Sequence, residues 1–181
     1  MPLTDTDLVV ENGTGLANSN AYATRAEADA YHLARANDTW ADADLNNKIA
    51  SLIRATDYVD RRWRWIGTKG LETQALQWPR EGAYDVNGFS LADEVPPALK
   101  QAVMEYALRI VEDLGDLLPD PDEDSTGAFV TLKREKVGPI EEETRYSDQI
   151  RPSAIRAYPS ADSILLRAGL VLGVGKSVIR G

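Results

Sequence analysis

The stretch that decides the fold is residues 96–118, PPALKQAVMEYALRIVEDLGDLL. Its apolar side chains recur three and four positions apart, which is the spacing of one face of an α-helix. Pro96 and Pro97 stand at the start, where a missing backbone N–H costs a helix little, and Pro119 follows the last apolar residue. The pattern predicts a helix that begins at these prolines and ends at Leu118, with one buried face.

Three more helices are predicted around this one. Thr24 and Glu27 have the spacing of a capping box, which places a helix over residues 25–36. An apolar stripe at helical spacing predicts another over residues 46–62. Serine and aspartate at the start of residues 160–168 predict a short last helix. The fold class is therefore mainly α, a small helical bundle.

Residues 63–96, between the helix predicted over 46–62 and the one that begins at Pro96, are rich in glycine and proline and are predicted to be irregular. Large aromatic side chains interrupt it. Because each ring can bury about 150–250 Å², we expect them to anchor the segment on the helices: Trp63, Trp65, Trp78, Tyr84 and Phe89.

Apolar and charged residues alternate in residues 126–150, around a turn at Gly138-Pro139, and predict a β-hairpin-like insertion. Two strands alone are marginally stable, so this insertion needs a partner. The predicted organisation is a helical core over 1–125, the insertion over 126–150, and a short helix with a C-terminal arm over 151–181. The insertion residues assigned to subunit–subunit contact are Val130, Leu132, Lys133, Arg134, Lys136, Val137 and Ile140.

Composition excludes several classes of chemistry. The 181 residues include no cysteine and one histidine, His32. Disulfides, a thiol nucleophile and Cys-based zinc sites are therefore excluded, and histidine-dependent catalysis loses support. No apolar run reaches the roughly 18 residues of a membrane span. We predict no metal, no cofactor, no membrane partner and no enzymatic activity.

Charge is unevenly spread along a chain whose net charge is -9. An acidic protein is repelled by phosphate backbones, which argues against nucleic-acid binding. Residues 82–125, with eleven acidic and two basic residues, are the most acidic part. Within them, Glu112 to Asp124 holds seven acidic residues and no basic one. If this stretch faced a channel it would repel DNA, and an outward solvated loop is the alternative. The candidate channel residues are Asp116, Asp120, Asp122, Glu123 and Asp124.

One basic and aromatic cluster keeps nucleic-acid binding open. It consists of Arg61, Arg62, Trp63, Arg64 and Trp65, in which guanidinium groups and indoles interleave. Such a pattern can grip phosphates and stack bases, at about 1–3 kcal/mol per stacked base. The alternative is that the tryptophans anchor the loop and the arginines pair with carboxylates.

Several short stretches carry a resemblance to a known family. The most specific is Gln74-x-Leu76-x-Trp78-Pro79-Arg80. The others are 17–22 (ANSNAY), 26–31 (AEADAY), 53–60 (IRATDYVD), 65–67 (WIG), 133–140 (KREKVGPI) and 158–166 (YPSADSILL). Together they span about residues 17–168, and they resemble the head–tail adaptor (connector) proteins of tailed bacteriophages, whose members are also described as DnaT-like single-stranded DNA-binding proteins.

The resemblance implies a structural virion protein of the phage neck that is assembled in the host cytoplasm. It implies a homo-oligomeric ring, usually of twelve copies, docked beneath the portal protein. Such a ring extends the DNA channel, lets DNA pass without specific binding, and joins the next tail component. The implied portal-binding arm is apolar and basic: Leu170, Val171, Leu172, Val174, Lys176, Val178, Ile179 and Arg180.

Overall fold

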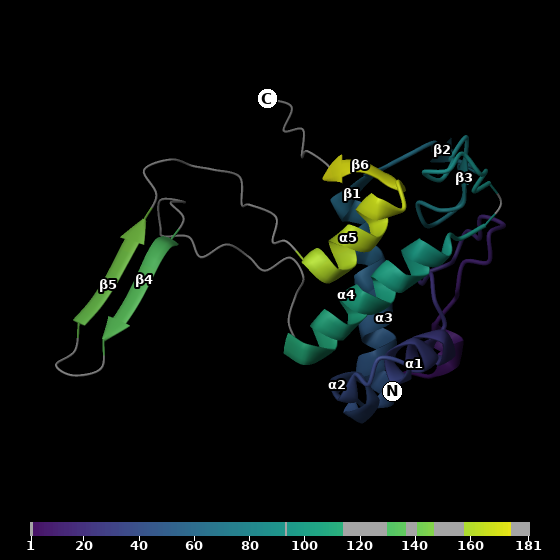
Figure 1. Ribbon diagram of the computed structural model, residues 1–181. Coiled ribbons are helices and arrows are strands. Elements are labelled where there is room, and N and C mark those ends of the chain that lie inside the picture. Colours follow the sequence, from purple (N-terminus) through teal and green to yellow (C-terminus); the bar gives the residue numbers. More distant parts are fainter. Residues whose placement is uncertain (1, 93, 114–129, 137–140, 147–157, 175–181) are drawn as a thin grey trace. The chain divides into compact units, whose positions relative to one another are not determined.

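The helix predicted from the opening stretch is present as α4, Pro97–Asp113, and packs along α3, Leu45–Arg62. The computed structural model describes residues 2–92, 94–113, 130–136, 141–146 and 158–174 (Figure 1). The predicted end of α4 at Leu118 lies outside these residues. Apolar faces of α3 and α4 form the centre of the core, with side chains such as Leu52, Val59, Leu99 and Val103 fully buried. The protein is mainly α, as predicted.

The first helix, α1 (Arg25–Leu33), begins as predicted and ends earlier. Thr24 and Glu27 form the expected capping box: Thr24 Oγ1 accepts from the Glu27 amide at 3.1 Å, and Glu27 Oε2 accepts from the Thr24 amide at 2.7 Å. The chain then turns through a positive φ of 52° at Ala36. This turn leads into α2, Asp38–Asp42, which places Trp40 in the core. A helix of five residues is too short to show a helical period, so the sequence did not reveal it.

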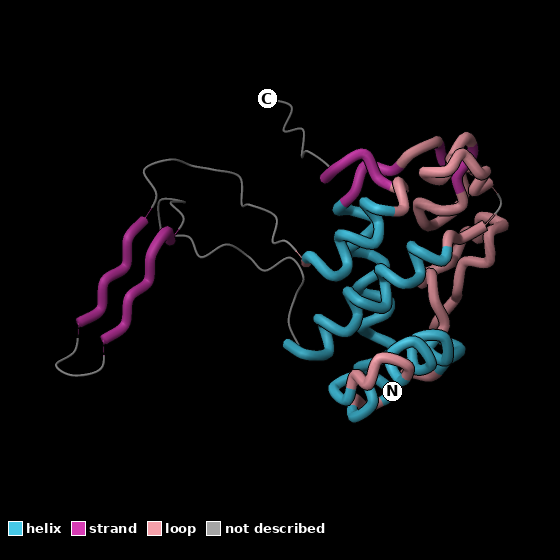
Figure 2. The backbone as a smooth tube through the Cα atoms, viewed as in Figure 1, coloured by secondary structure: helices cyan, strands magenta, loops and turns pink. Residues whose placement is uncertain are grey.

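The last helix, α5 (Pro159–Arg167), packs on α4 and leads into strand β6, Val171–Val174. β6 pairs antiparallel with β1, Trp63–Trp65, which directly follows α3 (Figures 1 and 2). Two shorter strands, β2 (Thr68–Lys69) and β3 (Arg80–Glu81), also pair antiparallel. In the chain before α1, Asp5–Asp7 form a short 3-10 helix, η1, and Val10 forms a single bridge with Ala21.

The predicted β-insertion is a hairpin of β4, Val130–Lys136, and β5, Glu141–Tyr146. The two strands pair antiparallel, with Lys133 opposite Thr144 and Arg134 opposite Glu143. The chain divides into two compact units, and this hairpin belongs to the second, Leu118–Arg156.

The first unit comprises Met1–Leu117 together with Ala157–Gly181. The helix α5 and the strand β6 therefore belong to the helical unit. Among the described residues, no helix combines the length and the apolar character that crossing a membrane requires.

Candidate interaction surfaces

The predicted DNA-binding stretch, Arg61 to Trp65, spans the end of α3 and strand β1, and the structure separates its members. Trp63 and Trp65 are buried, with 6% and 7% of their surfaces exposed, whereas Arg61 and Arg64 are exposed. Arg62 is buried as well. Guanidinium groups and indoles therefore do not share one surface, and in this conformation neither tryptophan can stack on a base.

The alternation of tryptophan and arginine in β1 is the sequence signal that predicts which of these side chains are buried. In a strand, successive side chains point to opposite faces. Trp63 and Trp65 consequently share one face and Arg64 takes the other, as the observed burial shows. The indole of Trp65 packs edge-on against Trp78, with ring centroids 6.1 Å apart. The anchoring role predicted for the tryptophans is confirmed, but Tyr84 and Phe89 are exposed instead of buried.

Arg62 is the centre of a buried polar network that joins three helices. Its Nη2 lies 2.7 Å from Asp162 Oδ2 on α5, and its Nη1 donates to the Tyr58 hydroxyl at 2.5 Å. The Tyr106 hydroxyl on α4 donates to the other Asp162 oxygen. Burial and the Asp162 carboxylate raise the pKa of Tyr106, so this phenol stays a neutral donor. The network fixes α5 on the helical core and uses Arg62 as a structural residue.

A half-buried carboxylate, Asp60, connects α3 to the segments before α1 and after β2. Asp60 Oδ1 accepts from the Tyr22 hydroxyl at 2.7 Å, and Oδ2 accepts from the Gln77 amide at 3.0 Å. The Tyr22 oxygen in turn accepts from the Trp78 amide at 3.1 Å. Burial raises the pKa of Asp60 to about 6, although both hydrogen bonds favour its charged form.

The most specific stretch of the sequence, Gln74 to Arg80, folds the irregular segment on itself. The Gln74 amide group donates to the carbonyls of Leu76 at 2.8 Å and Pro79 at 3.1 Å. The Arg80 guanidinium donates to the carbonyls of Ile66, Gly67 and Gln77 at 2.6–3.1 Å. These side chains satisfy backbone groups that have no ladder partner, which is what a buried irregular segment requires. Their role is structural.

The described part of the predicted portal-binding arm contributes both to the core and to the surface. Leu170 and Val171 are buried, and the Leu170 carbonyl accepts from the Ile66 amide at 3.2 Å. Leu172 and Val174 are exposed. Up to Val174 this segment pairs with β1 of the same chain. Lys176, Val178, Ile179 and Arg180 lie outside the described residues.

Other predicted surfaces fall wholly or partly outside the described residues. The candidate channel residues Asp116, Asp120, Asp122, Glu123 and Asp124 lie there, as do Val137 and Ile140 of the insertion. The remaining insertion residues, Val130, Leu132, Lys133, Arg134 and Lys136, all belong to strand β4. The channel-lining role and the subunit–subunit role therefore remain predictions.

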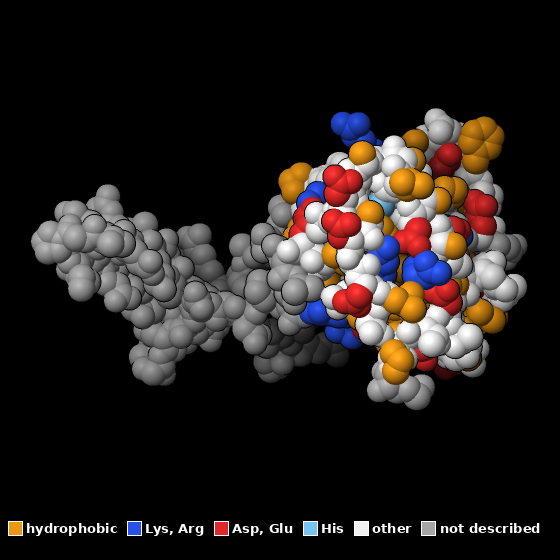
Figure 3. Space-filling view, turned by 90° about the horizontal axis from the view of Figure 1, so that it is seen from below, with side chains coloured by type: hydrophobic (Ala, Val, Ile, Leu, Met, Phe, Trp, Pro, Cys, Tyr) orange, Lys and Arg blue, Asp and Glu red, His pale blue; other side chains and the backbone are white. Residues whose placement is uncertain are grey.

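The described surface is mixed in chemistry. On the face shown in Figure 3, acidic, basic and apolar side chains are interspersed. Within the described parts of the chain, no group of three or more His, Asp or Glu residues is placed to hold a metal ion. The polar contacts that the structure does contain serve packing and capping.

Comparison with known proteins places the chain in a family. No curated protein and no solved structure matches it. The sequence model of one family, described as "Putative DnaT-like ssDNA binding protein", matches residues 6–180. The match covers the helical unit and the hairpin alike, which is nearly the whole chain. The chain therefore belongs to this DnaT-like family.

Proposed function

We propose that the chain is a structural virion protein, a head–tail adaptor that forms a homo-oligomeric ring between the portal and the tail. The observation that carries the proposal is the division into a helical unit and a hairpin unit, Leu118–Arg156, with only two described strands. A hairpin of two strands is marginal alone, whereas strands from neighbouring copies would complete a sheet. An assembly of identical copies supplies such neighbours.

Three further observations support an assembly protein. Buried Arg62 and half-buried Asp60 of the helical unit are both bound to other protein groups. Both tryptophans of the basic stretch belong to the core. The resemblance in Gln74–Arg80 and the neighbouring stretches points to the same family of adaptors. On this proposal the partners are further copies, the portal protein and the next tail component, and DNA passes through the ring without specific contacts.

The proposal is tested at the C-terminal segment that follows β6. Deleting residues 170–181 would remove buried Leu170 and Val171, so the informative changes lie beyond Val174. Val178→Asp places a charge in the apolar part of the segment, and Ser177→Asp is the matched control. Portal rings from the same phage, sedimented with each protein, should retain the wild type and Ser177→Asp and lose Val178→Asp. Equal retention of both variants would contradict the assignment of the arm.

Single-stranded DNA binding is the second candidate, and the family's description favours it. With the tryptophans buried, it would depend on the exposed Arg61 and Arg64, although Arg61 already lies 3.9 Å from Asp57. Anisotropy of a labelled oligothymidylate should then rise on adding protein, fall steeply with salt, and be lost in Arg61→Glu/Arg64→Glu. On the adaptor proposal the wild type shows no saturable binding at physiological salt.

A further inference from the structure

Over residues 132–136 and 141–145, the hairpin of β4 and β5 has no apolar face. In an antiparallel ladder, directly opposite residues share a face, and successive residues along a strand alternate between the two faces. The register divides the paired residues into two sets: Leu132, Arg134, Lys136, Glu141, Glu143 and Arg145 on one face, and Lys133, Glu135, Glu142 and Thr144 on the other. With one apolar residue among these ten, neither face is suited to packing against a hydrophobic core.

The two edges of the hairpin are open to a further strand. Within the described residues, β4 and β5 form a sheet of two strands, so each of them pairs along one edge only. A strand edge presents backbone N–H and C=O groups that another strand can bind. Because two strands alone are marginally stable, we expect a partner strand at these edges.

The two strands carry opposite net charge. β4 has three basic residues and one acidic residue, which is a net charge of +2. β5 has three acidic residues and one basic residue, which is a net charge of -2. The flanking residues 126–129 and 137–140 hold no charge, and 147–150 add one acid, Asp148. The difference between the strands therefore persists when their neighbours in the sequence are counted.

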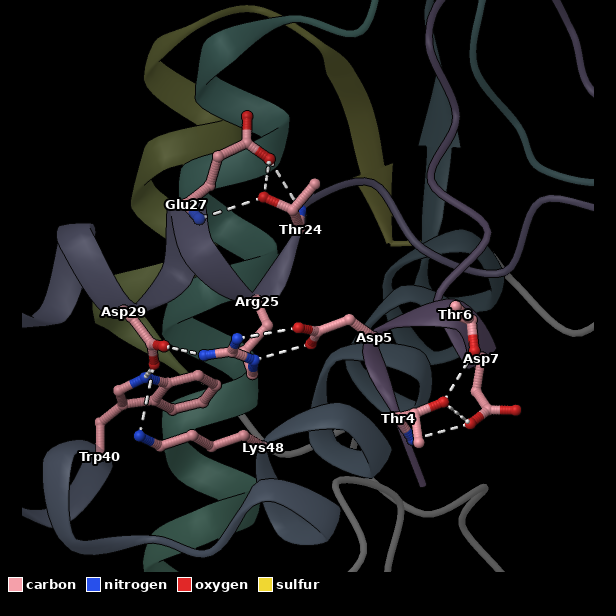
Figure 4. A network of polar contacts seen from close by, with 10 residues as sticks. All are labelled: Thr4, Asp5, Thr6, Asp7, Thr24, Arg25, Glu27, Asp29, Trp40 and Lys48. Atoms are coloured by element: carbon pink, nitrogen blue, oxygen red, sulfur yellow. Dashed lines mark hydrogen bonds and ion pairs between the residues drawn. The ribbon is translucent and has the colours of Figure 1, made fainter. Parts of the chain in front are cut away.

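The ion pairs drawn in Figure 4, in contrast, are internal to the helical unit. The Arg25 guanidinium binds both oxygens of Asp5 at 2.7 and 2.8 Å and also lies 2.5 Å from Asp29. Asp29 accepts from Trp40 Nε1 at 2.9 Å and lies 3.3 Å from Lys48 Nζ. These contacts join η1, α1, α2 and α3 of one copy. They stabilise the subunit and do not select a partner.

Charge selects which strands can pair at the open edges. Directly opposite like charges destabilise a pair of strands, and opposite charges stabilise it. Pairing β4 with β4 would bring together two strands of net charge +2, and pairing β5 with β5 two strands of net charge -2. Pairing β5 with β4 of another copy brings an acidic strand against a basic one. Charged edges also oppose indiscriminate pairing, so this distribution favours one combination over the others.

The hairpin itself contains the favoured combination. Three pairs of its register join two charged residues, two of them of opposite sign and one of like sign: Arg134–Glu143, Lys136–Glu141 and Glu135–Glu142. A β5 strand from another copy, on the open edge of β4, would meet the same basic residues.

Rotational symmetry produces this combination without inverting any copy. The strands of a hairpin run in opposite directions, so β5 of one copy and β4 of the next are antiparallel when all hairpins point the same way. Pairing between two different edges is heterologous, and it generates a ring when the rotation closes. Antiparallel pairing of β4 with β4, or of β5 with β5, needs a two-fold axis and joins copies only in pairs.

We infer that β5 of one copy pairs antiparallel with β4 of the next, so that the hairpins of neighbouring copies form one continuous sheet. This inference rests on the proposed homo-oligomeric function and deepens it, because it names the two strands and the direction in which the copies follow one another. The partner is a second copy of this chain. A phosphate backbone is the other acidic partner that basic β4 could bind, and binding of oligothymidylate distinguishes it.

Single cysteines report which strands meet, because the natural chain contains none. Lys133→Cys places a thiol in β4 and Thr144→Cys places one in β5, at positions that lie opposite one another in the hairpin. The two full-length variants are mixed equally and treated with a bis-maleimide that spans about 10 Å, which tolerates a register shift of about two residues. Peptide mass spectrometry identifies the linked positions.

Mixed links, which join one copy of each variant, should form at least about tenfold faster than links between two copies of the same variant, because pairing raises the effective concentration of the two thiols. Leu33→Cys, at an exposed position outside the hairpin, is the matched control and should react with Thr144→Cys only at the rate of chance collision. Faster links between two copies of the same variant would show that β4 or β5 pairs with itself. That result, or mixed links no faster than the control in solution and on portal rings, contradicts the inference.

An exchange of charge between the strands tests whether charge selects the partner. Arg134→Glu and Lys136→Glu are combined with Glu141→Lys and Glu143→Lys, so that both opposite-charge pairs of the hairpin are kept with their signs reversed. This fourfold variant should associate with itself as the wild type does. It should be excluded from wild-type assemblies, because strands of like charge would meet.

Native mass spectrometry of an equal mixture of the fourfold variant and isotope-labelled wild type measures this exclusion. Arg109→Glu/Glu112→Arg, which reverses an exposed ion pair on α4, is the matched control and should mix freely with the wild type. Free mixing of the fourfold variant, or its failure to associate by itself, contradicts the inference.

Portal binding and DNA binding, measured on the same proteins, separate this inference from the proposed function. If the wild type forms complete rings on the portal without mixed links, only the pairing inference fails. If mixed links form in solution but the wild type never binds portal rings, only the adaptor function fails. If mixed links are absent while Arg134→Glu/Lys136→Glu abolishes salt-dependent binding of oligothymidylate, β4 binds a phosphate backbone and the inference is wrong.

Discussion

The half-buried side chain of Asp60 makes the stability of the protein depend on pH. The carboxyl group is enclosed by the end of α3, Tyr22 and Gln77, and its pKa is about 6 against an ordinary value of 3.8. The folded state therefore binds the proton more tightly than the unfolded state. This contribution to stability is complete below pH 4 and is lost as the pH rises through 6.

Asp60→Asn tests this dependence. The difference between the two pKa values corresponds to about 3 kcal/mol. Because pH 4 lies only just above the ordinary pKa, the free energy of unfolding of the wild type, minus that of the variant, should fall by most of this amount, about 2 kcal/mol, between pH 4 and pH 7. Urea unfolding of both proteins at these pH values measures it, and contributions from other carboxyl groups cancel in the difference. A difference that does not change with pH would contradict the assignment.

A contact between residues a hundred positions apart, such as Arg62 and Asp162, cannot be predicted from the sequence. Nothing near Asp162 indicates that it pairs with Arg62, because the contact exists only once α5 has packed on the core. The burial of Trp63 and Trp65, in contrast, can be predicted, because their alternation with Arg64 is a strand signal visible in the sequence. Tyr84 and Phe89 carry no such signal, since an aromatic residue in a loop is equally compatible with either environment.

At the scale of elements, Asp162 anchors α5 and β6 to the helical unit. Asp162→Ala removes the carboxylate that pairs with buried Arg62 and accepts from Tyr106. Breaking a buried pair in this way costs about 3–5 kcal/mol. Urea unfolding should show this loss, and hydrogen exchange should rise first in residues 159–174.

Arg109→Ala is the control for that variant. Arg109 on α4 also reaches α5, through Ser160 Oγ at 3.3 Å, but this contact is exposed. Its loss should cost less than about 1 kcal/mol. If both substitutions destabilise equally, Asp162 is not the anchor.

Elements with strong local signals were predicted well. α3, α4 and the start of α1 follow from apolar spacing and from the Thr24–Glu27 capping box. The hairpin follows from alternating residues around a turn. The pairing of β1 with β6 could not be predicted, because it joins segments about a hundred residues apart and each strand has only three or four residues.

The hairpin unit is predicted to be dispensable for folding of the helical unit. α4 and α5, on either side of the insertion, contact one another through Arg109 and Ser160. A flexible linker of about six residues, which spans roughly 13 Å, should replace residues 118–156. Circular dichroism should show retained helix and a cooperative transition within a few degrees of the wild type. Loss of cooperative unfolding would show that the hairpin stabilises the helical unit.

At the scale of the whole molecule, net charge alone is a poor guide to function. The value of -9 argued against DNA binding, and the structure adds that the tryptophans between the arginines are core residues. Membership of the DnaT-like family shows what the chain is related to, and the two candidate functions are separated by the experiments proposed above.

The mass of the complex that the full chain forms with purified portal rings of the same phage tests the central claim most directly. Native mass spectrometry should show the portal ring plus a complete ring of adaptor subunits, each adding 19.9 kDa, with no partly filled rings dominating at saturation. A portal ring that gains no mass, in a preparation that binds oligothymidylate with strong salt dependence, would contradict the adaptor function and favour single-stranded DNA binding.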